Sequence, residues 1–202
     1  MKRLFLTLLI LLAGASALLA LTPQQVIDRS AQKLGKTASV KALYTLTADG
    51  NSVQGVLTMS GNRFTLSTPT LSVWFDGKTQ WTYSSQMGEV SIVTPTTDEL
   101  RQINPFEIIR SLAADFKQTT LKAPKGFTAV GLTAKNGSTD IRRADITFSD
   151  ATWYPTSLHI TLSNRQVIAV KIDQILPGQH LPESTFRFDP KKYPGVQVVD
   201  LR

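Results

Sequence analysis

The sequence predicts a mainly β protein, built as one strongly curved antiparallel sheet with two amphipathic helices. Three observations carry this prediction. Short runs of alternating apolar and polar residues, typical of half-buried strands, recur along the chain with turn-sized gaps between them. Asp76-Gly77 stands between two such runs, as a tight hairpin turn does. Two other segments begin with a helix-capping residue followed by proline, and continue with apolar residues at helical spacing.

The first twenty residues are typical of an export signal. Lys2 and Arg3 form a short basic region, residues 4–12 are apolar apart from Thr7, and small residues follow. The pattern predicts a signal peptide over residues 1–20, with cleavage somewhere in 17–21. An uncleaved membrane anchor is the alternative, because apolar character continues to Leu21, but the apolar stretch is short for a membrane span.

The composition limits the possible chemistry. The chain contains no cysteine, so it has no disulfide and no thiolate metal ligand, and its stability must come from a packed core. The net charge of +7 falls to +5 when Lys2 and Arg3 leave with the signal. The basic residues are scattered among acidic ones and form no stripe interleaved with aromatics, so we expect no nucleic-acid partner. We expect a single domain over residues 21–202.

The first helix is predicted to begin at residue 23. Thr22 can cap it, Pro23 suits the first helical position, and Gln25 stands where the partner of a capping box belongs. Gly35 can end the helix. Strands follow, with alternating apolar residues over residues 42–47, 53–59 and 64–66.

The next hairpin, LSVWFDGKTQW over residues 71–81, is rich in aromatic residues. Asp76-Gly77 fixes its turn, because glycine tolerates the positive φ that a tight turn needs. The pattern leaves the register open, and a slip of one residue would move Trp74 and Trp81 to the opposite face of the sheet. A further strand is expected around Val90 and Ile92.

A second helix is predicted over residues 105–116. Asn104 can cap it, Pro105 takes the first position, and Glu107 stands in the reciprocal capping position. Its apolar face combines Phe106, Ile109, Leu112, Ala113 and Phe116. Strands resume over residues 127–134, 141–148, 158–162 and 168–172, and a last short strand is expected around residues 186–188.

No arrangement of residues for catalysis or metal binding stands out. His159 and His180 are far apart, and neither has a histidine or carboxylate neighbour at metal-ligand spacing. No serine lies in a nucleophile elbow. Asp98 and Glu99 are adjacent, but at the start of a helical turn they favour its positive end. We therefore expect no enzyme, no catalytic residue, no metal and no cofactor, although distant carboxylates that converge only in the fold remain an alternative.

Apolar and aromatic side chains occur on both faces of some strands. Trp74 stands between Val73 and Phe75, and Leu43 stands beside Tyr44. The pattern fits a plain core beneath the helices, and it also fits an apolar ligand cavity. Periodicity alone leaves both interpretations open.

The order of these motifs resembles the periplasmic outer-membrane lipoprotein carrier family (LolA). The resemblance rests on Phe64-x-Leu66, on Trp74-Phe75-Asp76-Gly77-Lys78-Thr79-x-Trp81-x-Tyr83, and on the ending Phe186-x-Phe188-Asp189-Pro190 with Tyr193-Pro194-Gly195-Val196. The helix after Asn104-Pro105 has the position of the family's internal lid helix. The resemblance covers most of the chain after the signal.

This resemblance implies an incomplete, open antiparallel β-barrel of roughly eleven strands, with a helical lid over an apolar cavity. It implies a monomeric periplasmic carrier that receives acylated lipoproteins from an inner-membrane lipoprotein-releasing ABC transporter and delivers them to an outer-membrane acceptor. The expected lipid-binding cavity residues are Leu46, Leu57, Met59, Phe64, Leu66, Val73, Phe75, Trp81, Tyr83, Ile92, Ile160 and Val170. The expected lid residues are Phe106, Ile109, Leu112 and Phe116.

The sequence departs from the family at one position. In well-known members a strand arginine closes the lid, and that position falls near Thr65 here. The adjacent Arg63 is expected to point to the other face and receives no role. An envelope sensor or lipid-binding interaction domain on the same open-barrel fold is the alternative function, and an enzyme whose residues converge only in the fold is a third.

Overall fold

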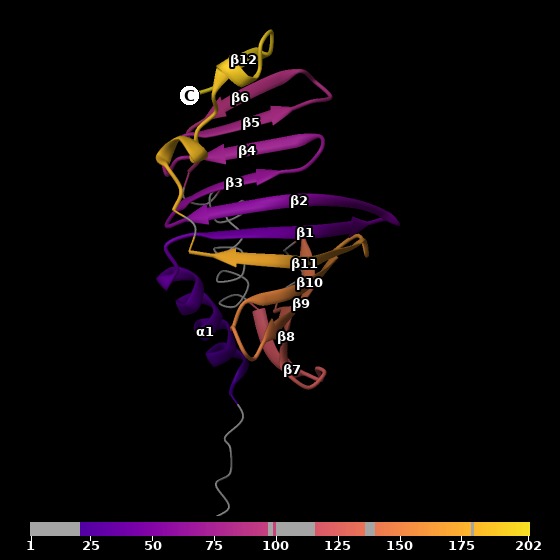
Figure 1. Ribbon diagram of the computed structural model, residues 1–202. Helices are drawn as coiled ribbons and strands as arrows, with labels where there is room; N and C mark the ends of the chain where they lie inside the picture. Colours follow the sequence, from indigo (N-terminus) through magenta and orange to yellow (C-terminus); the bar gives the residue numbers. More distant parts are fainter. Residues whose placement is uncertain (1–20, 97–98, 100–115, 136–139, 179) are drawn as a thin grey trace, which may run out of the picture.

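The computed structural model describes residues 21–96, 99, 116–135, 140–178 and 180–202. These residues form one helix and a 12-stranded sheet in the order β12-β6-β5-β4-β3-β2-β1-β11-β10-β9-β8-β7 (Figure 1). The edge strands β12 and β7 do not pair with each other, so the sheet is open. The predicted fold class, a mainly β open barrel with helical cover, is confirmed, with twelve described strands where roughly eleven were expected.

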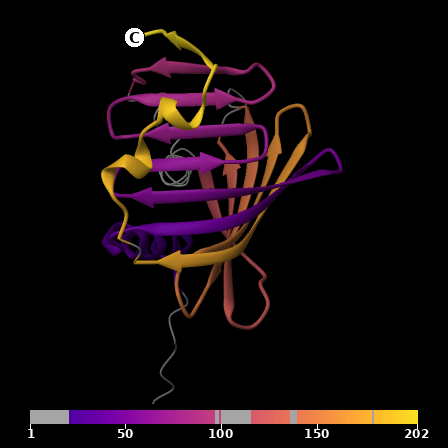
Figure 2. The ribbon, with the colours of Figure 1, turned by 45° about the horizontal axis from the view of Figure 1, so that its top comes forward.

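The sheet consists of two antiparallel meanders and the edge strand β12. Its strands are β1 (Val40–Ala48), β2 (Asn51–Ser60), β3 (Arg63–Ser67), β4 (Leu71–Phe75), β5 (Gln80–Ser84), β6 (Glu89–Val93), β7 (Phe116–Leu121), β8 (Phe127–Ala134), β9 (Ile141–Ser149), β10 (Pro155–Leu162), β11 (Val167–Pro177) and β12 (Gln197–Asp200). Strands β1 to β6 pair in chain order, as do β7 to β11, and the β1–β11 pair joins the two meanders. Figure 2 shows how the β7–β11 meander turns away from the plane of the first.

Helix α1 (Pro23–Lys36) begins where the sequence predicts. Gln25 N–H donates to the Thr22 hydroxyl oxygen at 3.3 Å, and Thr22 N–H donates to Gln25 Oε1 at 2.9 Å, which completes the capping box. Gly35 does not end the helix. The end comes at Lys36, and the hydroxyl of Thr37 donates back to the Lys33 carbonyl at 2.7 Å.

The Asp-Gly hairpin is confirmed as β4 and β5. The Asp76 carboxylate accepts hydrogen bonds from the backbone N–H groups of Lys78 at 3.0 Å and Thr79 at 2.9 Å, which holds the turn in shape. The register that the sequence left open pairs Trp74 with Trp81. Both tryptophans therefore lie on the same face of the sheet.

The apolar core lies on the face of the sheet that packs against α1, called here the inner face. Val26 and Ile27 of the helix pack on the strand residues Phe116, Val130, Leu132, Ala144, Ile146 and Phe148. These residues come from β7, β8 and β9, so α1 covers the inner face at that end of the sheet (Figure 1). A second, smaller cluster of Met59, Phe64 and Phe75 lies on the inner face of β2–β4.

After β11 the chain crosses the opposite face of the sheet, called here the outer face. This C-terminal segment, residues 181–196, contains two 3-10 helices, Glu183–Phe186 and Pro190–Lys192, and leads to β12, which pairs in parallel with β6. The prediction of a strand around residues 186–188 is therefore wrong. Pro182 precedes the first 3-10 helix and Pro190 opens the second, and a proline N atom cannot donate to a strand ladder.

Candidate functional site: an apolar cavity

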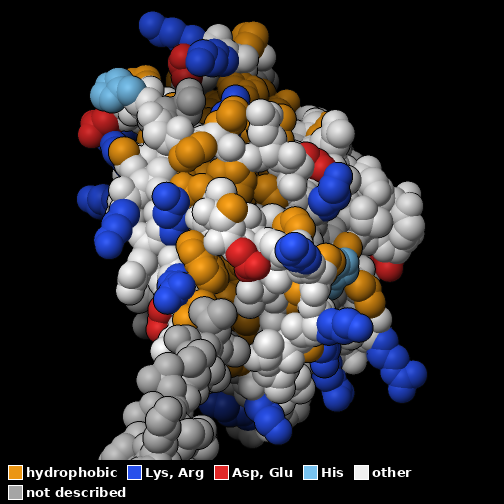
Figure 3. All heavy atoms as spheres, turned by 60° about the horizontal axis from the view of Figure 1, so that its bottom comes forward, with side chains coloured by type: hydrophobic (Ala, Val, Ile, Leu, Met, Phe, Trp, Pro, Cys, Tyr) orange, Lys and Arg blue, Asp and Glu red, His pale blue; other side chains and the backbone are white. Residues whose placement is uncertain are grey.

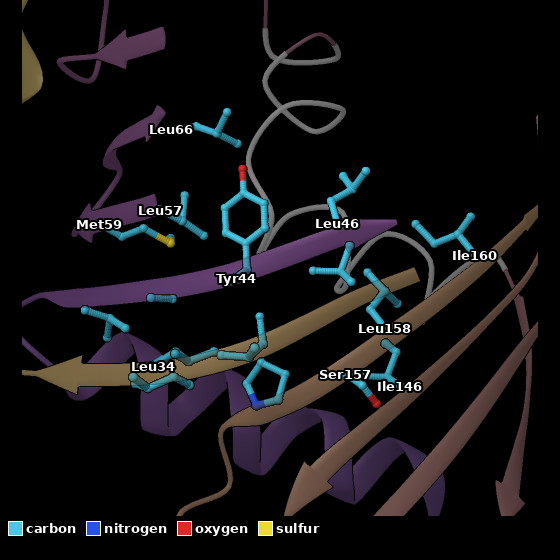
Figure 4. Close-up of a pocket in the computed structure, with 16 residues that line it drawn as sticks. Leu34, Tyr44, Leu46, Leu57, Met59, Leu66, Ile146, Ser157, Leu158 and Ile160 are labelled. Carbon is cyan, nitrogen blue, oxygen red and sulfur yellow. The ribbon is translucent and has the colours of Figure 1, made fainter. Parts of the chain in front are cut away.

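A cavity of about 240 Å³ opens on the inner face, between the region covered by α1 and the Met59–Phe64–Phe75 cluster (Figure 4). It is lined by Leu34, Val40, Ala42, Tyr44, Leu46, Leu57, Met59, Leu66, Ile146, Pro155, Ser157, Leu158, Ile160, Val170, Ile172 and Ile175. These residues come from α1, β1–β3 and β9–β11. Only Tyr44 and Ser157 of these sixteen carry a hydroxyl group, and none carries a charge. The site can therefore hold hydrocarbon.

A bulge in β11 supplies part of this lining. The pairing with β1 passes from Leu43–Gln174 to Tyr44–Ile172 and leaves Asp173 as an extra residue. Because side chains of a regular strand alternate, residues 172 and 175 would point to opposite faces without the bulge. The extra residue turns both Ile172 and Ile175 into the cavity.

Tyr44 enters the cavity beside a glycine. Its partner across the β1–β2 ladder is Gly55, and a Cβ atom at that position would lie 2.3 Å from both Cζ and the hydroxyl oxygen of Tyr44. The missing side chain therefore gives the phenol ring its place, and the ring rises from β1 in Figure 4. Burial raises the pKa of Tyr44 above its ordinary value of 10.0, so the phenol is neutral at physiological pH.

Half of the cavity residues expected from the sequence line this space. They are Leu46, Leu57, Met59, Leu66, Ile160 and Val170. Phe64, Val73 and Phe75 point to the same inner face, but they pack in the cluster around Met59 at the side of the cavity. The rings of Phe64 and Phe75 are 5.4 Å apart, and they support the wall instead of forming its surface.

Trp81, Tyr83 and Ile92 were expected in the cavity and lie on the outer face. The β4–β5 register pairs an odd-numbered residue of one strand with an even-numbered residue of the other. Trp81 therefore shares a face with Trp74 and not with Val73, and the β5–β6 pairing places Ile92 beside Trp81. The expectation for these three residues is corrected on this ground.

The outward-facing aromatics bind the C-terminal segment. Tyr83 lies 4.7 Å from Tyr193 between ring centroids, and Trp74 lies 5.6 Å from Phe188 and 5.7 Å from Tyr193. Phe188 and Tyr193 also contact each other at 5.2 Å. The aromatic hairpin is therefore a docking surface for the end of the chain.

The lid predicted from the sequence is only partly within the described chain. Phe106, Ile109 and Leu112 lie outside the described residues. Phe116 was expected on the lid helix, but it is the first residue of β7, paired with Ala134. It is 4% exposed and packs in the core under α1, which corrects its assignment.

Ten residues that line the cavity were not expected there. They are Leu34, Val40, Ala42, Tyr44, Ile146, Pro155, Ser157, Leu158, Ile172 and Ile175. Ala42 and Tyr44 precede Leu46 in steps of two residues along β1 and share its face, so extending the period-2 pattern from Leu46 would have found them. Leu158 lies two residues before Ile160 in β10, so the same pattern would have found it. Ile175 follows a break in this period, which only the bulge explains.

Arg63 and Thr65 lie on the same face of β3, because they are two residues apart. Both point outward, opposite to Phe64, so the expectation that they face different sides is wrong. Arg63 Nη1 donates to Glu183 Oε1 at 3.2 Å, and its guanidinium lies 5.1 Å from the centroid of the Phe186 ring. The structure thus gives Arg63 a role in holding the C-terminal segment.

Outside the cavity, the part of the chain that the structure describes contains few candidate functional groups. No group of three or more His, Cys, Asp and Glu side chains there could hold a metal ion, and no helix there is both long and apolar enough to cross a membrane. His159 is exposed on β10, and His180 is exposed in the loop after β11. Figure 3 shows Lys and Arg side chains spread over one face among apolar ones, without a continuous basic stripe.

The protein is thus an open, mainly β barrel with an uncharged hydrocarbon cavity, a kind of cavity that suits apolar ligands. The sequence matches the family model for the outer membrane lipoprotein carrier protein LolA over residues 15–163. The chain belongs to this family, and the resemblance inferred from its motifs is confirmed. A comparison with curated protein sequences gives no match.

Several solved structures are similar to this one at low sequence identity. An uncharacterized conserved protein from Thermus thermophilus has a TM-score of 0.61 and 11% identity, with 88% of this chain and 98% of that chain covered. MucB has a TM-score of 0.53 and 12% identity, over 83% of this chain and 62% of that chain, so this chain spans less than two thirds of MucB. A LolA superfamily protein from Nitrosomonas europaea has a TM-score of 0.41 and 10% identity, over 84% and 99%. At identities this low, the first two structures, with TM-scores above 0.5, show the fold alone.

Proposed function

We propose that this protein is a periplasmic carrier that shields the acyl chains of lipoproteins in the inner-face cavity and ferries them from the inner to the outer membrane. The observation that carries the proposal is the lining itself, in which fourteen of the sixteen residues have hydrocarbon or thioether side chains and none is charged. Membership of the outer membrane lipoprotein carrier protein LolA family supports it.

The need to shield acyl chains from water explains why the proposed function requires no reactive centre. An acyl chain exposed to water costs roughly 0.8 kcal/mol for each methylene, so a lipoprotein needs shelter to cross an aqueous compartment. Hydrophobic stabilisation is proportional to the apolar area removed from water and needs no particular geometry. A hydrocarbon lining can therefore accept the acyl chains of different cargo proteins. Delivery leaves the cargo chemically unchanged.

The wider transport cycle belongs to the same proposal. It includes removal of residues 1–20 on export, a single monomeric domain over residues 21–202, an inner-membrane lipoprotein-releasing ABC transporter as donor, and an outer-membrane acceptor. It also includes a lid that carries Phe106, Ile109 and Leu112 and competes with cargo for the cavity. Competition of this kind would keep binding reversible.

Two neighbouring residues of β3 allow a matched test. Leu66 lines the cavity, whereas Thr65 points to the outer face. A photo-crosslinking amino acid at Leu66 should capture acylated lipoprotein in cells, and the same amino acid at Thr65 should not. Equal capture at both positions, or none at Leu66 while cargo co-purifies, would rule out the cavity as the cargo site.

An envelope sensor or interaction domain on the same fold makes a different prediction. A carrier releases its cargo to an acceptor, whereas a sensor retains the lipid and changes its affinity for a partner protein. Purified protein loaded with a triacylated lipopeptide should lose it to vesicles that carry the outer-membrane acceptor. Retention of the lipopeptide, with lipid-dependent capture of a partner protein, would favour the sensor.

A further inference from the structure

The two hydroxyl groups of the cavity have different surroundings. Tyr44 is 8% exposed, whereas Ser157 is only partly buried. Within the described residues, the Tyr44 hydroxyl makes no hydrogen bond, but its oxygen keeps contact with solvent, because the only fully buried side-chain polar atom without a partner there is Gln80 Oε1. A ligand that fills the cavity would remove this solvent contact, and a donor that is buried without a partner is unfavourable.

The other buried tyrosine provides a contrast within the same molecule. The hydroxyl of Tyr154 lies 3.1 Å from the Thr37 hydroxyl oxygen, so one of these groups donates to the other. Tyr44 is instead directed over Gly55, at a place where any larger residue would collide with it. The fold thus reserves space for a phenol and gives its hydroxyl no partner among the described residues.

A ligand that fits this place must be largely apolar and must offer an acceptor. An acyl chain attached through an ester or amide carries a carbonyl oxygen, which accepts hydrogen bonds and has no proton to give. A free fatty acid would bring a carboxylate into a cavity whose lining contains no Lys, Arg or His side chain, which is costly. An alkane would leave the phenol without a partner.

We propose that the Tyr44 hydroxyl donates a hydrogen bond to the ester or amide carbonyl of a bound acyl chain, and that this contact makes the cavity selective for esterified or amidated chains over plain hydrocarbon and free acid. This inference rests on the proposed function, because it assigns a recognition contact within the same cavity. Burial raises the pKa of the phenol and keeps it protonated at physiological pH, as a donor must be.

Water is the competing partner for this hydroxyl. Tyr44 also borders a second, more open pocket of about 450 Å³ with Gln54, Gly55, Thr68 and Pro69. A water molecule that enters from that side could accept the phenol proton in place of a carbonyl. The hydroxyl would then have no effect on ligand choice, and this outcome is measurable.

The test compares two lipids that differ only at the carbonyl. A diacylglycerol and the dialkyl ether analogue of the same chain length compete with an environment-sensitive fluorophore in the purified protein. The wild type should prefer the ester over the ether, and Tyr44→Phe should reduce this preference by about fivefold, because it deletes one neutral hydrogen bond. Tyr154→Phe, which removes the other buried phenol hydroxyl, should leave the preference unchanged.

An infrared measurement separates a direct contact from a change in packing. A diacylglycerol labelled with ¹³C at the ester carbonyls should show a carbonyl band at lower wavenumber in the wild type than in Tyr44→Phe, since a donated hydrogen bond weakens the C=O bond. Equal ester-to-ether ratios in the wild type and Tyr44→Phe, or an identical carbonyl band, would overturn the inference and leave the carrier proposal standing. If the wild type bound neither lipid and no lipopeptide, the carrier proposal itself would fail.

Discussion

The guanidinium group of Arg63 lies over the ring of Phe186, 5.1 Å from its centroid. This contact joins β3 to a segment that is remote in sequence, and Phe186 is 0% exposed beneath it. Nearby, Arg187 forms an ion pair with Asp76 at the turn between β4 and β5, with 3.2 Å between Nε and Oδ2. Apolar burial and charged contacts therefore fix the C-terminal segment together.

We expect Phe186→Ala to be among the most destabilising single substitutions in this segment. Truncation of a fully buried phenylalanine leaves a cavity and costs roughly 3–5 kcal/mol of the free energy of unfolding. Phe127→Ala is the matched control, because Phe127 is 41% exposed and its loss should cost about 1 kcal/mol or less. Urea unfolding monitored by tryptophan fluorescence measures both, and equal losses would contradict the packing described here.

Arg63→Ala should cost more than Glu183→Gln. The ion pair involves a Glu183 side chain that is 84% exposed, so solvent screens it and its loss should change the free energy of unfolding by about 0.5 kcal/mol or less. The arginine also covers the Phe186 ring, a contact worth about 0.5–2 kcal/mol when it is partly shielded from water. Urea unfolding of the two variants checks the order, and a larger effect of Glu183→Gln would show that the ion pair dominates.

Gly55→Ala should destabilise the protein because of Tyr44. The added Cβ would lie 2.3 Å from the phenol ring, so the ring or the strand must move, at a cost of about 1–3 kcal/mol. Combined with Tyr44→Ala, the same change should cost much less than the sum of the two single effects. Gly35→Ala is the control with the opposite sign. Gly35 lies in α1, and a Cβ added there would have no neighbouring atom within 4 Å, so the alanine should stabilise the protein by about 0.5–1 kcal/mol.

The stability of the protein should fall in alkaline solution partly through Tyr44. Its folded-state pKa is raised above 10.0 by burial, so the unfolded chain releases the phenol proton at a lower pH than the folded chain. This contribution to stability is complete below pH 10 and is lost as pH rises from there through the folded pKa. Urea unfolding at about pH 8 and about pH 11 should show a smaller loss for Tyr44→Phe than for the wild type. An equal loss in both proteins would place the alkaline sensitivity elsewhere.

Local signals in the sequence predicted local structure well. The capping box of Thr22 and Gln25 and the turn at Asp76 each depend on neighbours within a few residues, and both have the expected geometry. The face of each strand depends on pairing with another strand, which the sequence pattern does not contain. Trp81 and Tyr83 were placed in the cavity for this reason, and they do share one face of β5, but it is the outer face.

Two strands were missed for a different physical reason. β7 is an edge strand whose middle residues Lys117 to Thr120 are polar, and it begins at Phe116, which completes a helical apolar pattern in the sequence. β12 contains only four residues and is ordered by its parallel pairing with β6. Neither strand has enough apolar alternation of its own to predict it.

The C-terminal segment and β12 together contact the strands β3 to β6 one after another. Glu183 contacts Arg63 on β3, Arg187 contacts the turn after β4, Tyr193 contacts Tyr83 on β5, and Val198 pairs with Val90 on β6. Because the same segment is covalently continuous with β11, which pairs with β1, it forms a belt around the strands from β1 to β6. The belt has a fixed contour length, so these strands cannot splay apart independently. The strands β8, β9 and β10 lack this restraint, so we expect any motion that widens the cavity for a bulkier guest to come from their half of the sheet.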